Sequence, residues 1–170
     1  MAGPDLSIVI ANWNTRDLTL ECIASIYEST HTVSFEIIVV DNGSTDDSVT
    51  AIAWRYPKVM IVANEANQGF ARASNQGMLR ASGRFVALLN SDTVVRDGAF
   101  DRLVGFMVTH PECGLVGPKV LSPQGDWVNR PRRFHIWWHD IIWLASYLSD
   151  LDLNGLLARV RPQRAGIGVR

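Results

Sequence analysis

Short apolar runs and segments of helical periodicity take turns along the first 121 residues. The apolar runs, rich in Val, Ile and Leu, predict β-strands at 6–11, 35–40, 59–63, 85–89 and 115–121. Between them, apolar residues recur roughly every three to four positions, which predicts helices at 15–29, 44–56, 70–81 and 98–109. Side chains that favour helix starts accompany two of these helices: Ser44, Asp46 and Asp47 at the second, and Asp97 at the fourth.

This order of elements predicts βαβ units, and therefore an α/β fold with a mainly parallel sheet. Near-continuous apolar strands are typical of a sheet that helices cover on both faces. The sequence at 122–125, Ser-Pro-Gln-Gly, predicts a turn after the fifth strand. From Asn129 onward the chain is rich in Arg and Trp, and its pattern does not assign it to the same sheet.

The length of 170 residues predicts one domain that buries a core of its own. A hydrophobic fraction of 47% and a charged fraction of 19% exclude an intrinsically disordered chain. No apolar run reaches the about 18 residues that a membrane span needs, and residues 1–5 show no secretory pattern. Cys22 and Cys113 make neither a disulfide framework nor a metal site. We therefore expect a reduced, cytoplasmic protein.

The net charge of −1 conceals an uneven distribution of charge. Residues 130–170 carry seven arginines and three aspartates, a balance of +4, so residues 1–129 carry −5. Such a split indicates two kinds of partner. Nucleic acid is not expected among them, because no recognition motif accompanies the basic tail.

Polar residues follow each of the first four predicted strands. Ligands of open α/β sheets bind outside the carboxyl ends of the strands, so these residues are expected to line one cleft. Turns favour the same residue types, and a single loop of this kind would indicate little. Together the loops predict a polar ligand site built from Asn12-Trp13-Asn14, Asp41-Asn42-Gly43-Ser44, Asn64-Glu65, Asn67-Gln68-Gly69 and Asn90-Ser91-Asp92-Thr93.

Missing motifs narrow the class of ligand. The turn after the first strand contains no glycine, which disfavours a dinucleotide fold, and there is no Walker-type phosphate loop. An acidic pair of the kind a phospho-receiver domain uses is also missing there. His135 and His139 share a helical spacing but lack a third zinc ligand. What remains is a diphosphate site in which a divalent cation held by a carboxylate replaces the glycine loop.

Individual residues fit parts of such a site. Asp92, at the end of a predicted buried strand, is suited to hold the cation or contact the diphosphate; its alternative role is a turn or helix cap, for which Asp97 is better placed. Asp41 is suited to accept hydrogen bonds from a base imide or a ribose hydroxyl, and its alternative role is an Asx turn. Asn12 and Asn14 can present backbone and amide groups to a base edge.

An ordered series of segments resembles the family-2 glycosyltransferases, in particular the branch that includes rhamnosyltransferases. The resemblance covers residues 6–126, and its segments are SIVIANWN (7–14), EIIVVDNGSTDDS (36–48), NQGFARASNQG (67–77), FVALLNSDT (85–93) and VGPKVLSPQG (116–125). It implies a GT-A fold, which is Rossmann-like, a nucleotide-diphosphate sugar donor carrying dTDP, UDP or GDP, and an Mg²⁺ or Mn²⁺ ion. It also implies a glycan or lipid-linked acceptor, as in the biosynthesis of cell-surface polysaccharides.

The resemblance carries site roles over by position. Asp41 would contact the nucleoside, residues 12–14 would line the base pocket, and residues 90–92 would form an Asp-x-Asp-type motif with Asp92 facing the metal. Its first position is Asn90, a form that this branch often shows, and position 74 is serine where relatives often have arginine or asparagine. The implied nucleotide-sugar site comprises Asn12, Trp13, Asn14, Asp41, Asn42, Gly69, Asn75, Asn90, Ser91 and Asp92, with Asp92 as metal ligand.

Transfer with inversion needs a general base, and the sequence does not identify a catalytic residue for this role. In the family the base is a carboxylate in an acidic motif well downstream of the metal motif. Asp150 and Asp152 resemble that motif only superficially. We therefore expect the chain to be truncated after the donor-binding half. The alternatives to an active transferase are a catalytically inactive fragment that still binds nucleotide, and a fragment without function.

The Arg- and Trp-rich tail at 127–170 is expected to form a segment apart from the nucleotide-sugar-binding domain at 1–126. Four of the six tryptophans lie between 127 and 143. On a helix, Trp137, Ile141, Leu144 and Leu148 would share one face. Basic residues beside such a face suit a membrane surface, which would place the protein at the inner face of the membrane. The alternative is a helix that packs on the sheet or on acceptor-side elements.

Overall fold

The computed structural model describes residues 3–128 of the chain. Contacts divide the chain into two compact units, residues 1–118 and 119–170, and each unit is described by itself. The first unit holds a parallel sheet of strand order β3-β2-β1-β4. Its strands are β1 (Leu6–Asn12), β2 (Phe35–Asp41), β3 (Met60–Ala63) and β4 (Phe85–Asn90). The predicted α/β fold with a mainly parallel sheet is therefore confirmed.

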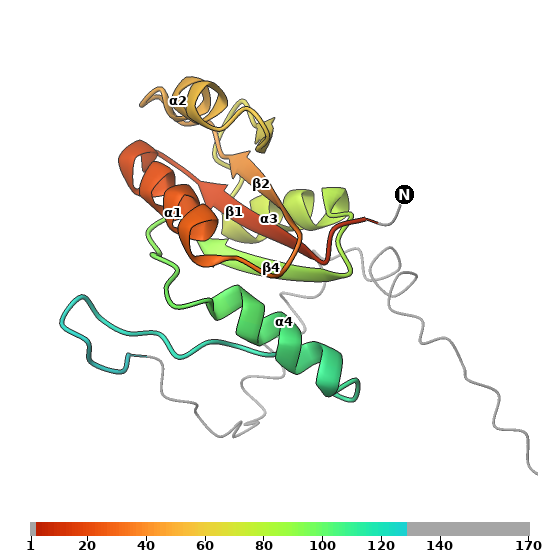
Figure 1. Cartoon of the computed structure of the whole chain (residues 1–170). Coiled ribbons are helices and arrows are strands. Elements are labelled where there is room, and N and C mark those ends of the chain that lie inside the picture. The colour runs from red at the N-terminus through yellow and green to blue at the C-terminus, as the bar shows by residue number, and fades with distance from the viewer. Residues whose placement is uncertain (1–2, 129–170) are drawn as a thin grey trace, which may run out of the picture. The chain divides into compact units, whose positions relative to one another are not determined.

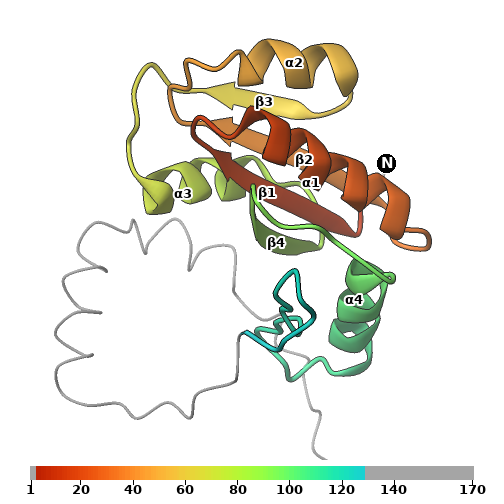
Figure 2. The same ribbon diagram turned by 90° about the vertical axis from the view of Figure 1, so that its left-hand side faces the viewer.

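Four helices connect and cover these strands (Figure 1). They are α1 (Arg16–Ser29), α2 (Ser48–Arg55), α3 (Phe70–Arg80) and α4 (Ala99–Thr109). Figures 1 and 2 show α1 and α3 on opposite faces of the sheet. Side chains alternate between the two faces along each strand, so each face of the central strands carries its own apolar core.

The larger core lies between the sheet and helices α1, α2 and α4. It combines alternate residues of β1 and β2 with buried side chains of those helices, among them Ile8, Ile10, Ile23, Ile26, Ile52 and Phe100. The smaller core lies under α3 and contains Val9, Ile38, Val40 and Ala73. Both central strands are thus buried on both faces, as their continuous apolar sequences predict.

Strand β4 departs from the expectation that helices cover both faces of the sheet. Phe85, Ala87 and Leu89 pack against the larger core, whereas Val86 and Leu88 on the opposite face are 46% and 50% exposed. Strand β4 is the last strand in the sheet order, and α3 packs against β1 and β2 instead. The prediction of a fully buried strand before Asp92 was therefore wrong, because continuous apolar sequence cannot distinguish a covered face from an open one.

The predicted fifth strand at 115–121 is absent among the described residues. Pro118 has no backbone N–H to donate to a ladder, Gly114 and Gly117 weaken the segment, and Leu115 is 89% exposed. In the second unit only an isolated antiparallel bridge forms within the described part, between Leu121 and Trp127. The turn that the sequence predicts at 122–125 closes this bridge, with the Gly125 N–H donating to the Ser122 carbonyl at 2.9 Å.

Two predicted helix starts also shift. Helix α2 begins at Ser48 instead of Ser44, because residues 42–47 form the loop that carries much of the site; Asp46 accepts the Ser48 N–H at 3.2 Å. Helix α4 begins at Ala99 after two residues of left-handed backbone, Asp97 and Gly98, and no side chain caps it. The expected cap by Asp97 was therefore wrong, since a capping residue needs extended backbone.

Candidate functional site

The strand register brings the polar loops to one edge of the sheet. Asn12 at the end of β1 is paired with Asp41 at the end of β2, and Ala11 is paired with Asn90 at the end of β4. Because the strands are parallel, the loops that follow them leave the sheet at this same edge (Figure 2). The structure therefore brings together the segments that the sequence predicts to share a cleft.

The centre of this edge is a buried pair of polar side chains. The Asn12 Nδ2 donates to Asp41 Oδ1 at 2.6 Å, and the two residues are only 1% and 2% exposed. Asn12 Oδ1 in turn accepts hydrogen bonds from the hydroxyls of Thr15 at 2.7 Å and Thr19 at 2.8 Å. Asp41 Oδ2 accepts the backbone N–H of Ser44 at 2.9 Å, so the Asx turn considered as its alternative role is present.

This arrangement leaves Asp41 with acceptor capacity. A carboxylate offers about four lone-pair positions, and the hydrogen bonds from Asn12 and Ser44 use two of them. Buried carboxylates are stabilised by such N–H donors, so the side chain is held in one orientation at the end of β2. Asp41 can thus act both as a structural residue of the loop and as an acceptor for a ligand donor.

The loops after β1 and β2 are also tied together. Asn14 has left-handed backbone with φ of 54°, its N–H donates to Ser44 Oγ at 2.9 Å, and its Oδ1 accepts the Thr45 N–H at 2.8 Å. The Asn12 Nδ2 reaches the same Ser44 Oγ at 3.1 Å. Both asparagine side chains that the sequence assigns to a base pocket therefore make hydrogen bonds within the protein.

Asn42 fixes the loop between β3 and α3. Its Oδ1 accepts from Asn64 Nδ2 at 3.1 Å and from the Gln68 N–H at 3.2 Å. Its Nδ2 donates to Asn67 Oδ1 at 3.1 Å and to the Gly69 carbonyl at 3.2 Å. One buried side chain thus satisfies four polar groups of a loop whose residues are otherwise largely exposed, and it places the start of α3 beside the end of β2.

Two glycines permit these loop shapes. Gly43 has φ of +76°, and a Cβ there would lie 2.8 Å from the Ala66 Cα. Gly69 has φ of +85° at the N-terminus of α3, with open space around it. Residues with a Cβ rarely adopt backbone of positive φ, so this conformation favours glycine at both positions. At Gly43 the close approach of the neighbouring loop also leaves no space for a Cβ.

The third loop, after β4, joins the network through one contact. Thr15 Oγ1 lies 3.0 Å from Ser91 Oγ, across 76 positions of sequence. The Asn90 carbonyl accepts the Thr93 N–H at 3.2 Å and lies 3.7 Å from the thiol of Cys22. Burial raises the pKa of that thiol to about 12, so Cys22 remains a neutral core residue beneath the loop.

Asp92 extends from this loop into solvent. In the described part of the chain its carboxylate has neither a hydrogen-bond donor nor an ion-pair partner, so it shows no capping role. Within residues 3–128 no group of three or more His, Cys, Asp or Glu side chains gathers around it or elsewhere. The residues present fit a cation that takes one protein carboxylate and completes its shell with phosphate oxygens and water, which is how Mg²⁺ is commonly held.

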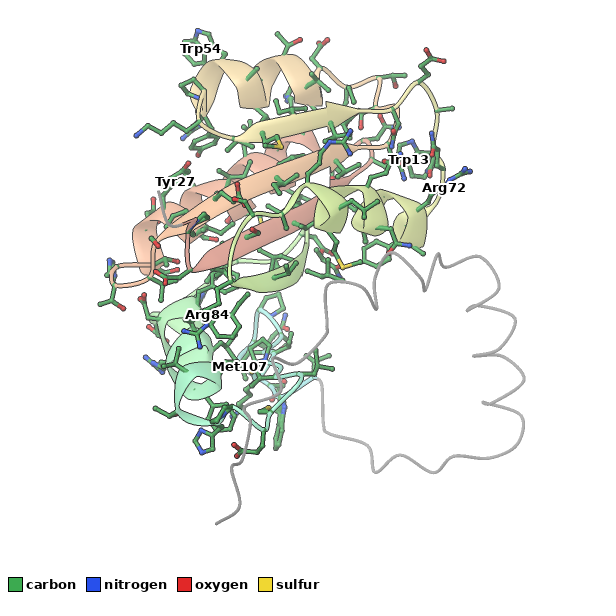
Figure 3. All side chains as sticks on the ribbon, turned by 90° about the vertical axis from the view of Figure 1, so that its right-hand side faces the viewer. Trp13, Tyr27, Trp54, Arg72, Arg84 and Met107 are labelled. Atoms are coloured by element: carbon green, nitrogen blue, oxygen red, sulfur yellow. The ribbon has the colours of Figure 1, made fainter. Side chains whose placement is uncertain are left out.

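Figure 3 shows Trp13 and Arg72 at the surface of the first unit. Trp13 follows β1 and is 54% exposed, and Arg72 is exposed in the first turn of α3. Asn75, one turn further along α3, is half-buried, and its side chain makes no hydrogen bond within the described residues. These three side chains are therefore open to a ligand, in contrast to Asn12, which is fully engaged in the interior.

A shallow hollow at the start of α1 adjoins this network. It is lined by Asn14, Thr15, Arg16, Asp17, Leu18, Asp46 and Asp47. Asp46 accepts the Arg16 N–H there at 2.8 Å. Burial alone would raise the pKa of Asp46, but the hydrogen bonds from Arg16 and Ser48 lower the pKa of this carboxyl. Three carboxylates outnumber the one cation of the lining, Arg16, which is paired with Asp17 at 2.8 Å, so the hollow disfavours an anionic diphosphate.

Sequence reasoning missed Thr15, and it included Asn64 in a polar loop without predicting its contacts. Thr15 connects Asn12 with the loop after β4, and Asn64 connects Asn42 with Gln76 of α3 at 2.8 Å. Both follow predicted strands within a few positions, which is the only signal that the sequence provides. Neither can be recognised by periodicity, because their partners are brought close by the sheet.

Comparison with known proteins defines the class of this chain. Residues 7–157 match the sequence profile of glycosyl transferase family 2, which is most of the chain. The chain therefore belongs to glycosyltransferase family 2, and the resemblance noted from its motifs is confirmed. The fold of the first unit agrees with that of solved GT-A glycosyltransferases.

Particular relatives extend this result. The chain is 32% identical to the glycosyltransferase GlyG of Streptococcus pneumoniae over 101 residues, which cover 58% of this chain and 33% of GlyG. It is 30% identical to the amylovoran biosynthesis glycosyltransferase AmsE of Erwinia amylovora over 105 residues, or 60% of this chain and 39% of AmsE. The chain thus spans about a third of the length of the curated relatives that it matches.

A solved structure supports the same fold. The mannosyltransferase PcManGT from Pyrobaculum calidifontis, in complex with GDP-Man and Mn²⁺, superposes with a TM-score of 0.57 and 25% identity. The match covers 72% of this chain and 37% of PcManGT. No helix within residues 3–128 is long and apolar enough to cross a membrane. The expected membrane-facing segment at 130–148 and the residues Asp150 and Asp152 lie outside the described residues.

Proposed function

We propose that this chain binds a nucleotide-diphosphate sugar together with Mg²⁺ or Mn²⁺ at the carboxyl edge of its sheet, as the donor-binding part of an inverting glycosyltransferase. The observation that carries the proposal is the position of Asp41 and Asp92. The register places the ends of β2 and β4 on either side of β1, with a buried acceptor carboxylate after one and an exposed carboxylate after the other.

In this proposal Asp41 accepts a hydrogen bond from the nucleoside. Its orientation is fixed by Asn12 and Ser44, so little side-chain entropy is lost when a ligand donor arrives. Trp13, the residue after Asn12, is exposed, and Asn75 of α3 is half-buried, and both would be open to the base or the sugar. Asn42 and Gly69 act indirectly, because they fix the loop that closes the site beside β3.

Asp92 would hold the divalent cation, with Asn90 and Ser91 next to the diphosphate. A bound cation would neutralise the charge that develops on the leaving diphosphate. The mannosyltransferase PcManGT, solved with GDP-Man and Mn²⁺, supports a donor and a metal of this kind. The acceptor in the proposal is a hydroxyl of a cell-surface polysaccharide or lipid-linked glycan, which the name of AmsE, an amylovoran biosynthesis enzyme, supports.

Thermal unfolding with UDP, dTDP or GDP, each with Mn²⁺ or with a chelator, tests the donor site. A ligand at about 100 times its dissociation constant stabilises a protein by about 2.7 kcal/mol. We expect a shift with one nucleotide that requires Mn²⁺. Asp92→Asn should abolish the metal dependence, whereas Asp97→Asn, which removes an exposed carboxylate five residues further along, should keep it.

The results separate the possible functions. A cooperatively unfolding chain that shows no shift with any nucleotide contradicts the donor site. A metal-dependent shift without release of nucleotide from a sugar donor in the presence of a hydroxyl acceptor identifies a nucleotide-binding module that does not transfer sugar. Release of the nucleotide together with glycosylated acceptor of inverted configuration establishes the full proposal.

A further inference from the structure

The hydroxyl of Thr15 is used in an unusual way. Thr15 occupies the N-cap position of α1, where a threonine side chain commonly bonds to a backbone N–H of the first turn. Here it makes no such bond. The Thr15 hydroxyl instead contacts Asn12 Oδ1 at 2.7 Å and Ser91 Oγ at 3.0 Å.

These contacts complete a hydrogen-bonded path across the site. Ser91 contacts Thr15, Thr15 contacts Asn12, and Asn12 donates to Asp41 at 2.6 Å. The path connects the loop that carries Asp92 with the carboxylate at the end of β2. Among the hydrogen bonds of residues 3–128, the Thr15 contact is the one that joins the side chain of a residue in the 90–92 loop to this buried pair.

We propose that Thr15 is a positioning residue that couples the metal-carrying loop at 90–92 to the nucleoside-binding carboxylate of Asp41. The inference rests on the proposed function, since it concerns how two parts of one donor site communicate. Thr15 itself need not touch the nucleotide. It acts through Ser91, which sets the position of the neighbouring Asp92, and through Asn12, which orients Asp41.

Proton counting gives this path two arrangements. Each hydroxyl has one proton to donate. When Thr15 donates to Asn12, it has no proton left for Ser91, and the Thr19 hydroxyl donates to the Thr15 carbonyl at 2.9 Å. When Thr19, 2.8 Å from Asn12 Oδ1, supplies that hydrogen bond instead, Thr15 donates to Ser91 and the Ser91 proton is free for a diphosphate oxygen. A ligand oxygen at Ser91 therefore selects the second arrangement without leaving Asn12 unsatisfied.

The test compares dissociation constants in variants of the full chain. For the nucleoside diphosphate that binds, the dissociation constant is measured by calorimetry with chelator and with Mn²⁺. The constant with chelator divided by the constant with Mn²⁺ reports how strongly the metal strengthens nucleotide binding. Thr15→Val should lower this ratio by about two- to tenfold, the loss expected for one hydrogen bond, and Thr15→Ser should restore it. The affinity for the corresponding free nucleoside without metal should change less than about twofold, because the Asn12–Asp41 contact remains.

A matched control lies at the other end of the same helix. Thr30→Val removes the same atoms, and the buried Thr30 hydroxyl has no hydrogen-bond partner within the described residues, so this variant should keep the wild-type ratio. Ser91→Ala combined with Thr15→Val should lower the ratio no further than Ser91→Ala alone, because both changes break the same contact.

The outcomes decide between this inference and the function on which it rests. A wild-type chain that binds no nucleotide overturns both. A wild-type chain that binds with metal dependence, while Thr15→Val keeps the ratio or the two changes act independently, overturns only the positioning role of Thr15. A lowered ratio that Thr15→Ser does not restore shows a packing effect of the side chain and likewise contradicts the proposal.

Discussion

Gly77 of α3 sets the distance between this helix and the sheet. A Cβ at Gly77 would overlap the Val9 side chain and lie 3.2 Å from Val40 Cγ2. Both valines are fully buried in the core beneath α3. The start of the same helix carries the loop that Asn42 fixes at the site, so an outward shift of α3 would also move part of the site.

The expected effect of Gly77→Ala is the sum of two opposing contributions. Replacing a helical glycine by alanine stabilises by up to about 1 kcal/mol when there is space for the methyl group. Overpacking a well-packed core costs about 1–3 kcal/mol, and the overlap with Val9 places Gly77 in this class. We therefore expect Gly77→Ala to lower the free energy of unfolding by up to about 2 kcal/mol, the overpacking cost less the helix gain.

Gly105 of α4 provides the matched control. It also lies inside a helix, but among the described residues a methyl group at this position would have no atom within 4 Å outside its own helix backbone, so Gly105→Ala should stabilise by about 0.5–1 kcal/mol. Urea unfolding followed by far-UV circular dichroism measures both variants, with equal m-values as the check on two-state behaviour. If Gly77→Ala stabilises the chain as much as Gly105→Ala does, the close approach of α3 to β1 is refuted.

Three further predictions concern single side chains. Burial alone would raise the pKa of Asp101, but hydrogen bonds from the loop around Thr32 lower it from 3.8 to about 2. The resulting stability is present above about pH 4 and lost as pH falls through about 2, so wild type should lose more stability than Asp101→Asn over this window in acid titrations of unfolding. Thr30→Val should raise the melting temperature, because it removes a buried hydroxyl without a partner in the described part of the chain; a lowered melting temperature contradicts this. A thiol reagent should label Cys113 first and Cys22 only on unfolding, since burial raises the pKa of Cys22 to about 12; equal labelling rates would show otherwise.

The elements of the first unit could be predicted because their signals are local. The strands ending at Asn12 and Asp41 are continuous apolar runs, and the intervening helices repeat apolar residues at helical spacing. The strand predicted at 115–121 failed because a strand also needs a partner edge, and the sequence does not show whether one is available. The open face of β4 was missed for the same reason, since exposure depends on which helix packs where.

The candidate site was predictable in composition but not in its internal contacts. The rule that ligands bind at the carboxyl ends of parallel strands was sufficient to select Asp41 and Asp92. It did not reveal that Asn12 lies fully buried against Asp41, or that Thr15 leaves its capping role to contact Ser91. Such contacts join residues that are 29 and 76 positions apart, so they exist only once the sheet has formed.

The sequence by itself determined the α/β class, the family and the loops that carry polar chemistry, because these depend on periodicity, motif order and position relative to the strands. Only the tertiary structure decided which polar side chains face inward and which remain open to a ligand. Asp41 and Asp92 are both aspartates that follow apolar strands, yet one is enclosed by hydrogen-bond donors and the other stands in solvent. The physical reason is the strand order: among the described residues β2 lies inside the sheet and β4 is its last strand, where fewer neighbours surround the loop that follows.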